Sequence, residues 1–261
     1  MTLRLLLPPS VGAARAHARA ELLDQSLRAD LAEAVEIDIA DSYADLAQRT
    51  EAGEAHLVWM PPTICARLEP RCRSIHKCVR HGHATYRSCI VARKGEVSSL
   101  SGLIGLRPAW VDRLSVGGCL LAQDELRRHG IDSADLGAQT FEGSYPDAVD
   151  AVLHHRADFT ALTVRDDTPA ATRDGIAAYG GKPATDHLVG IHVTRSSPND
   201  AIGVTDALDP RRAEKIARRV FDQSGARARA ALCLALDAEG FIRATRGEYA
   251  PLRRLIRHAE A

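Results

Sequence analysis

Hydrophobic and polar positions alternate along this chain in short blocks that predict strands and helices in turn. In the first part of the chain, apolar runs of strand length occur at Leu3–Leu7, Val35–Ile39 and His56–Met60. Between them, residues 13–29 carry leucines at helical spacing, and Ser42 is placed to cap a second helix that ends at Gly53. This alternation of strand and helix is typical of a parallel sheet covered by helices.

The same alternation starts again after residue 85. Strands are predicted at Tyr86–Arg93, Leu106–Val111, Gln139–Phe141, Phe159–Val164 and His187–Val193. Residues 165–186 are rich in Asp, Thr, Gly and Pro, which predicts a loop with at most one helical turn. The rest is predicted to be helical, over 210–223, 226–237 and 248–258. We therefore expect two lobes, residues 1–85 with 190–261 and residues 86–189, between which the chain crosses twice.

Residues 105–131 hold the most informative local pattern. An apolar strand runs into a polar turn from Asp112 to Gly118, and an amphipathic helix follows and stops at Gly130. The first N–H groups of a helix lack acceptors within the helix and lie at the positive end of its dipole. Such a turn is suited to a small anion. The pattern therefore predicts a receptor for a small, anionic molecule.

The composition excludes several other functions. Hydrophobic residues make up 45% of the chain and charged residues 26%, as in globular proteins. Lys plus Arg equals Asp plus Glu at 34 each, so no net charge attracts nucleic acid or draws the protein to a membrane. No run of about 20 apolar residues is present to insert into a membrane, and three leucines before Pro8 are too few for a secretory signal. We expect a cytoplasmic protein, or a periplasmic one if a leader has been removed.

Residues 65–83 contain several cysteines and histidines, which raises the question of a metal site. Structural zinc sites use closely spaced cysteine pairs, whereas six and five residues separate Cys65, Cys72 and Cys78. We therefore expect free thiols, no metal and no cofactor, and we interpret this basic stretch as a solvated connector. The chain lacks the common nucleophile and phosphate-loop motifs, which favours a binding protein over an enzyme.

Five longer segments resemble, in the same order, the motifs of the phosphate-, phosphite- and phosphonate-binding subunits of ABC importers. They are ATYRSCIVARKG (84–95), SLSGLIGLRPAWVDRLSVGGCLLAQDELRRHGID (99–132), FEGSYPDAVDAVLHHRADFTAL (141–162), SPNDAIGVTDALDP (197–210) and GFIRATRGEYAPLRRLI (240–256). The resemblance implies an α/β, two-lobed fold of the type 2 periplasmic-binding-protein kind. In that fold each lobe is a mostly parallel sheet flanked by helices, and the protein closes on its ligand about two hinge crossings.

The polar turn departs from the pattern of that family. Phosphonate binders place a run of hydroxyl residues before the helix, whereas the corresponding positions here are Ser115, Val116 and Gly117, preceded by Arg113. A buried oxyanion needs nearly all its oxygens hydrogen-bonded, because each missing partner costs about 1–3 kcal/mol. We therefore hypothesise a carboxylate-bearing ligand, since Arg113 can bind a carboxylate with two hydrogen bonds.

The residues expected to bind the ligand lie mainly at strand ends and helix starts of both lobes. They are Ser10, Ser42, Trp59, Met60, Tyr86, Arg113, Ser115, Val116, Gly117, Ser144, Tyr145 and Thr163. A structural interpretation stands beside the functional one, in which the serines cap helices and Trp59 belongs to the core.

The leading hypothesis is a cytoplasmic sensor or carrier whose protein partner is a transporter or a signalling protein. One alternative is an enzyme on the same fold, similar to chorismate dehydratase. The other is the phosphonate- or phosphate-binding subunit of an ABC importer.

Overall fold

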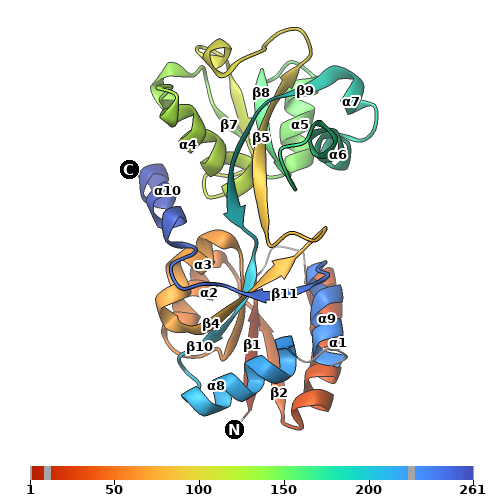
Figure 1. Cartoon of the computed structure of the whole chain (residues 1–261), viewed down its shortest axis with the longest axis vertical. Helices are drawn as coiled ribbons and strands as arrows, with labels where there is room; N and C mark the ends of the chain where they lie inside the picture. The colour runs from red at the N-terminus through yellow and green to blue at the C-terminus, as the bar shows by residue number, and fades with distance from the viewer. Residues whose placement is uncertain (1, 9–12, 223–226, 261) are drawn as a thin grey trace. The chain divides into compact units, whose positions relative to one another are not determined.

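The computed structural model describes residues 2–8, 13–222 and 227–260 (Figure 1). The chain divides into two compact units. Unit 1 comprises Met1–Ala84 and Pro198–Arg253, and unit 2 comprises Thr85–Ser197 and Arg254–Ala261. The chain thus passes between the units after Ala84, before Pro198 and again after Arg253. The sequence led us to expect two passages, after residues 85 and 189.

Unit 1 contains a six-stranded sheet in the order β11-β4-β10-β3-β1-β2. Its strands are β1 (Leu3–Leu7), β2 (Val35–Ile39), β3 (Leu57–Met60), β4 (Cys72–Val79), β10 (Ala201–Thr205) and β11 (Gly240–Arg243). β1 pairs in parallel with β2 and β3, whereas β10 runs antiparallel to β3 and β4. The leucine run of β1 is buried on both faces of the sheet, which is why it reads as continuously apolar.

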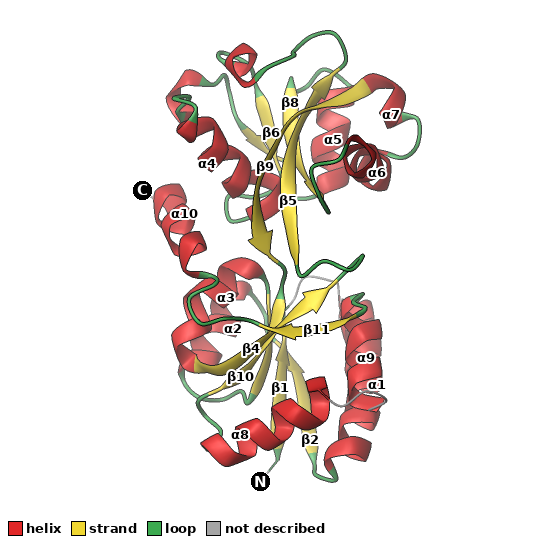
Figure 2. Cartoon of the chain, in the orientation of Figure 1, coloured by secondary structure: helices red, strands yellow, loops and turns green. Residues whose placement is uncertain are grey.

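In the described part of the chain, six α-helices belong wholly or partly to unit 1. They are α1 (Ala13–Leu31), α2 (Tyr43–Glu51), α3 (Pro62–Leu68), α8 (Pro210–Ala217), α9 (Arg227–Leu236) and the start of α10 (Ala250–Glu260). Leu5 on one face of the sheet joins a core cluster with Leu27 of α1, Ile216 of α8 and Leu232 of α9. α2 and α3 pack against each other, away from α1 and α9 (Figure 2). Helices therefore cover both faces.

Unit 2 contains a five-stranded sheet in the order β7-β6-β8-β5-β9. Its strands are β5 (Thr85–Arg93), β6 (Pro108–Trp110), β7 (Thr140–Phe141), β8 (Phe159–Val164) and β9 (Leu188–Pro198). Its helices are α4 (Leu121–Arg128), α5 (Tyr145–Leu153), α6 (Pro169–Gly180) and α7 (Ala184–His187), with a π-helical turn at Val116–Leu120 leading into α4. One core cluster joins Val91 of β5 to α5 and α6, and another joins Ile90 to α4.

The predicted α/β fold, with two sheets flanked by helices, is confirmed. Both sheets are mixed, and the added antiparallel strands explain the difference from the mostly parallel sheets expected. In unit 1, β10 returns from unit 2 and enters the sheet in the direction opposite to β3. In unit 2, β5 arrives from unit 1 and runs antiparallel to β8.

Two local predictions were wrong. Residues 65–83 hold the end of α3 and the strand β4, with Cys65, His76 and Cys78 buried, instead of a solvated connector. Residues 165–186 hold α6, which begins where Thr168 accepts a hydrogen bond from the main-chain N–H of Ala171. The Thr-Pro pair that suggested a loop is the cap and first residue of this helix. All six cysteines are free thiols, as expected.

His76 provides a test of the burial of β4. Its imidazole is 2% exposed and stacks on Phe221 with 4.0 Å between ring centroids. Burial lowers the pKa of His76 from 6.5 to about 4. The unfolded chain therefore takes up a proton before the folded chain does, so stability is present above pH 6.5 and is lost as the pH falls toward 4.

We expect His76 to make the folded protein about 2 kcal/mol less stable at about pH 5 than at about pH 7.5. Urea unfolding at both pH values measures this difference. His76→Phe should remove it, whereas His154→Phe, at an exposed position, should leave it unchanged. An equal pH dependence in wild type and His76→Phe would contradict the assignment.

Candidate functional site

The polar turn before α4 is organised by Ser115. The Ser115 hydroxyl accepts a hydrogen bond from the Gly118 N–H at 3.1 Å, and the Ser115 carbonyl accepts one from the Leu120 N–H at 2.9 Å. The Val111 N–H donates to the Gly118 carbonyl at 3.2 Å, which ties the turn to the end of β6. A Cβ at Gly118 would lie 2.4 Å from Val111 Cγ2. The turn therefore needs glycine here because a side chain would overlap that of Val111.

Three side chains from other elements surround the neighbouring Gly117. A Cβ at Gly117 would lie 2.4 Å from Thr163 Cγ2 on β8, 2.8 Å from the Tyr145 hydroxyl on α5 and 3.1 Å from Tyr86 Cε2 on β5. The Gly117 carbonyl accepts a hydrogen bond from the Ser88 hydroxyl at 2.6 Å. Two strands and a helix start thus converge on a position where only glycine fits.

The hydroxyl groups around Gly117 are linked to one another. The Tyr145 ring stacks on Tyr179 of α6 with 4.5 Å between centroids, and the Ser115 hydroxyl lies near enough to oppose the rise that burial causes in the pKa of Tyr145. The Thr163 hydroxyl is hydrogen-bonded with the Tyr179 hydroxyl. Burial raises the pKa of both tyrosines, so both phenols stay protonated and able to donate. We call Tyr86, Ser115, Gly117, Tyr145, Thr163 and Tyr179 the Gly117 cluster.

The structure thus brings together most of the site residues predicted in unit 2. Tyr86, Ser115, Gly117, Tyr145 and Thr163 belong to the Gly117 cluster, and Val116 is buried in the same turn. Arg113 is exposed, and its guanidinium carbon lies 4.4 Å from the ring centroid of Phe141. Ser144 caps α5, accepting from the Asp147 N–H at 3.2 Å.

Three of the four site residues predicted in unit 1 have identified structural contacts. The Trp59 indole N–H donates to Asp200 Oδ2 at 2.7 Å. Met60 is fully buried beside Gly203, and Ser42 caps α2 by accepting from the Asp45 N–H at 3.0 Å. Ser10 lies outside the described residues. A role in ligand binding for these four residues stays a prediction.

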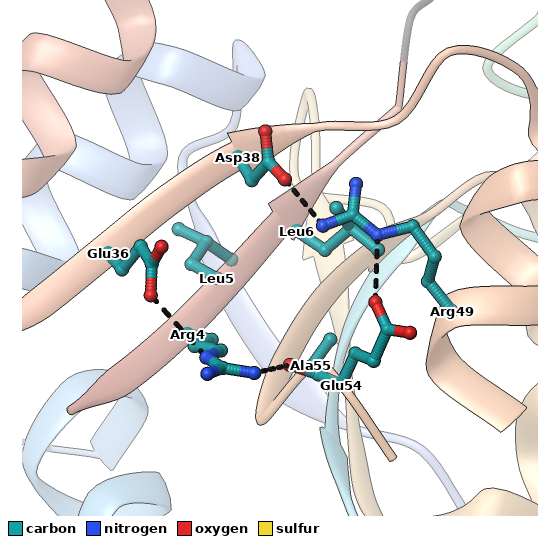
Figure 3. A pocket seen from close by; sticks show the side chains of 8 residues that line it. All are labelled: Arg4, Leu5, Leu6, Glu36, Asp38, Arg49, Glu54 and Ala55. Atoms are coloured by element: carbon teal, nitrogen blue, oxygen red, sulfur yellow. Dashed lines mark hydrogen bonds and ion pairs between the residues drawn. The ribbon is translucent and has the colours of Figure 1, made fainter. Parts of the chain in front are cut away.

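A pocket of about 230 Å³ opens beside β1 and β2 (Figure 3). Its charges pair with one another: Arg4 lies 3.4 Å from Glu36, and Arg49 lies 3.2 Å from Glu54 and also pairs with Asp38. The pocket is smaller than the roughly 300–1,000 Å³ usual for ligand sites. Its internal ion pairs and small size do not favour it as the ligand site.

The described residues hold no group of three His, Cys, Asp or Glu side chains arranged to bind a metal ion. Among the helices in the described ranges, none is long and apolar enough to cross a membrane. Burial raises the pKa of Cys119, just inside the turn, to about 12, so this thiol is not activated by its place near a helix start.

Residues 5–249 match the family of periplasmic substrate-binding proteins of phosphonate ABC transporters. The chain belongs to this family. The resemblance found in the sequence motifs is therefore confirmed. No curated protein sequence matches the chain.

Solved structures of this fold cover nearly the whole chain. XAC2383 from Xanthomonas citri, solved with chloride and with ATP, has a TM-score of 0.80 at 19% identity, covering 99% of this chain and 97% of its own. PhnD1 from Prochlorococcus marinus, in complex with methylphosphonate, has a TM-score of 0.71 at 17% identity, covering 99% and 98%. A binding protein of an ABC phosphonate transporter from Pseudomonas aeruginosa, PA3383, has a TM-score of 0.71 at 15% identity, covering 99% and 86%. At these identities the likeness establishes the fold.

Tyr179 is the member of the Gly117 cluster that the sequence analysis missed. It lies on α6, in the stretch predicted as a loop, so it was not placed near the turn. A Thr-Pro helix start followed by Ile176 and Tyr179 at helical spacing was the available signal.

The close packing of Gly117 predicts the effect of a single methyl group. Gly117→Ala should lower the free energy of unfolding by about 1–3 kcal/mol, because the new Cβ overlaps Thr163 and Tyr145. Adding Thr163→Ser, which removes the closest methyl, should restore part of the loss.

Urea unfolding measures both effects. Gly102→Ala is the matched control, since its nearest contact would be Val97 Cγ1 at 3.3 Å. A loss no greater for Gly117→Ala than for Gly102→Ala would show that the cluster is loosely packed.

Proposed function

We propose that this chain is the substrate-binding component of an ABC importer and that the Gly117 cluster binds the anionic group of a small oxyanion, a phosphonate before others. Family membership supports the class of function. The main support for the proposed ligand is the presence of several hydroxyl groups around Gly117.

A phosphonate group has three oxygens that need hydrogen-bond donors once water is excluded. The turn by itself offers one hydroxyl, Ser115, which is why its sequence suggested a poor phosphonate site. Tyr145, Thr163 and Tyr179 add three hydroxyls from α5, β8 and α6. The N–H groups at the start of the helix add further donors. Because the Thr163 and Tyr179 hydroxyls are bonded to each other, one of their two protons is left for a ligand. With Ser115, Tyr145 and the helix N–H groups, the donors are still enough for the three oxygens.

The carboxylate hypothesis depended on Arg113. That side chain is exposed and lies over Phe141, so the described residues of the Gly117 cluster include no guanidinium that would select a carboxylate over a phosphonate. The fold relatives were solved with chloride, ATP and methylphosphonate, and all three are anions, which supports an anionic ligand. The family is described as periplasmic, and the cytoplasmic sensor or carrier expected from the sequence stays a prediction.

Calorimetric titration of the full chain with methylphosphonate, phosphate and acetate tests the proposal. We expect methylphosphonate or phosphate to bind more tightly than acetate. Tyr145→Phe should weaken that binding roughly 10- to 100-fold, since a hydrogen bond to a charged group contributes about 1.5–3 kcal/mol. Acetate binding alone would restore the carboxylate hypothesis and contradict ours.

A matched pair of threonine variants separates binding from stability. Thr163→Val removes a hydroxyl of the Gly117 cluster and should weaken the same ligand. Thr185→Val removes a hydroxyl that donates to the Lys182 carbonyl at 2.7 Å and should leave the affinity unchanged. Equal affinities in both variants would place the ligand elsewhere.

A further inference from the structure

A second charged cavity lies within unit 1. Its volume is about 620 Å³, and it is bordered by the start of β4, the end of β11, the loop after β11 and α10. Four arginines line it against two carboxylates: Arg73, Arg243, Arg246 and Arg253, with Glu69 and Asp206. We call it the arginine cavity. The whole chain has equal numbers of basic and acidic residues, so this lining is a local excess of positive charge.

Both carboxylates of the cavity already have cationic partners. Glu69 Oε2 lies 2.6 Å from Arg253 Nη2, and Asp206 Oδ2 lies 3.3 Å from Nη1 of Arg71, which is outside the lining. Glu69 Oε1 also accepts a hydrogen bond from the Gly247 N–H at 2.6 Å. Gly247 has a φ of +86°, a conformation that glycine adopts without strain. Glu69 thereby holds the loop and α10 at the cavity wall.

The positive charge of the other three arginines is not neutralised by a close, buried carboxylate among the described residues and can attract a ligand. Arg73 donates to two main-chain carbonyls, those of Leu208 at 2.7 Å and Asp206 at 3.2 Å, which orient the guanidinium without neutralising it. Arg243 lies 3.7 Å from Glu214 in an exposed pair, and such pairs contribute little. Arg246 makes no hydrogen bond or ion pair with the residues in the described ranges.

We infer that the arginine cavity binds a small molecule through a diphosphate group. A planar guanidinium can form two parallel hydrogen bonds with the oxygens of a phosphate group. Several guanidinium groups in one cavity favour a ligand that has more than one negative charge. The volume lies within the roughly 300–1,000 Å³ of small-molecule sites. The cavity is formed by residues of unit 1 alone, so this inference does not rest on the function proposed for the Gly117 cluster.

Titration of the full chain with pyrophosphate and, separately, with ADP tests the inference. We expect both to bind, because the diphosphate is the group recognised. The double variant Arg243→Gln with Arg246→Gln should weaken binding at least tenfold. Arg165→Gln, which removes a partly exposed guanidinium paired with Asp174 in unit 2, is the matched control and should have no effect. Raising the salt from about 50 mM to about 300 mM should weaken binding, because exposed charges are screened.

Competition separates this cavity from the Gly117 cluster. Pyrophosphate should bind with unchanged affinity when methylphosphonate is saturating, and Thr163→Val should not affect it. Two results would overturn the arginine cavity as the pyrophosphate site while leaving the proposed function intact. One is displacement of pyrophosphate by methylphosphonate. The other is weaker pyrophosphate binding in Thr163→Val together with unchanged binding in the double arginine variant. Binding of ADP without pyrophosphate, or of neither at millimolar concentration, would overturn diphosphate recognition.

Discussion

The packing of unit 1 depends on the hydrogen bonds and the ion pair made by the carboxylate of Asp200. It accepts hydrogen bonds from the Trp59 indole at 2.7 Å and from both terminal nitrogens of Arg80, at 2.5 and 3.1 Å. Arg80 also donates to the carbonyls of Leu236 and Asp237 at the end of α9. One mostly buried ion pair thus joins β3, β4, the start of β10 and α9. A charge in this position is tolerated because every partner is in place, and loss of one partner would leave the other buried without compensation.

The neighbouring residue extends this constraint toward the Gly117 cluster. The Asn199 N–H donates to the Ala84 carbonyl at 3.0 Å, and its side-chain amide donates to the His83 carbonyl at 3.1 Å. The passage that leaves unit 1 after Ala84 and the one that returns to it at Pro198 are therefore hydrogen-bonded to each other within unit 1. Within unit 2 the same two strands are joined again, where the Ser88 N–H donates to the Thr194 hydroxyl at 3.0 Å. Ser88 in turn donates to the Gly117 carbonyl. The strand that enters unit 2 therefore helps to position the turn at the centre of the candidate site.

Much of the fold could be predicted because burial leaves a direct trace in sequence. β1, β2 and β8 have the bounds predicted for them, since each is a short run of mainly apolar or β-branched residues between turn residues. β4 was missed because Arg73 and Lys77 interrupt its apolar positions, although Lys77 is buried through its pairing with Glu248. Pairing between residues so distant in sequence leaves no local pattern. The site shows the same limit: Ser115 and Gly117 stand out in the turn, whereas Tyr179 reaches it only through the fold.

The same reasoning explains why the family motif is a poor guide to the ligand. A motif counts donors along one turn, but a ligand meets all donors that converge in space. In this chain the turn has one hydroxyl and an arginine, and that arginine is placed over an aromatic ring contributed by β7. Further hydroxyls near the turn come from α5, β8 and α6, and they are held by the stacking of Tyr145 on Tyr179 and by the hydrogen bond between Thr163 and Tyr179. Under the proposed function, the loss of hydroxyls from the turn is offset by donors that other elements supply near the same helix start.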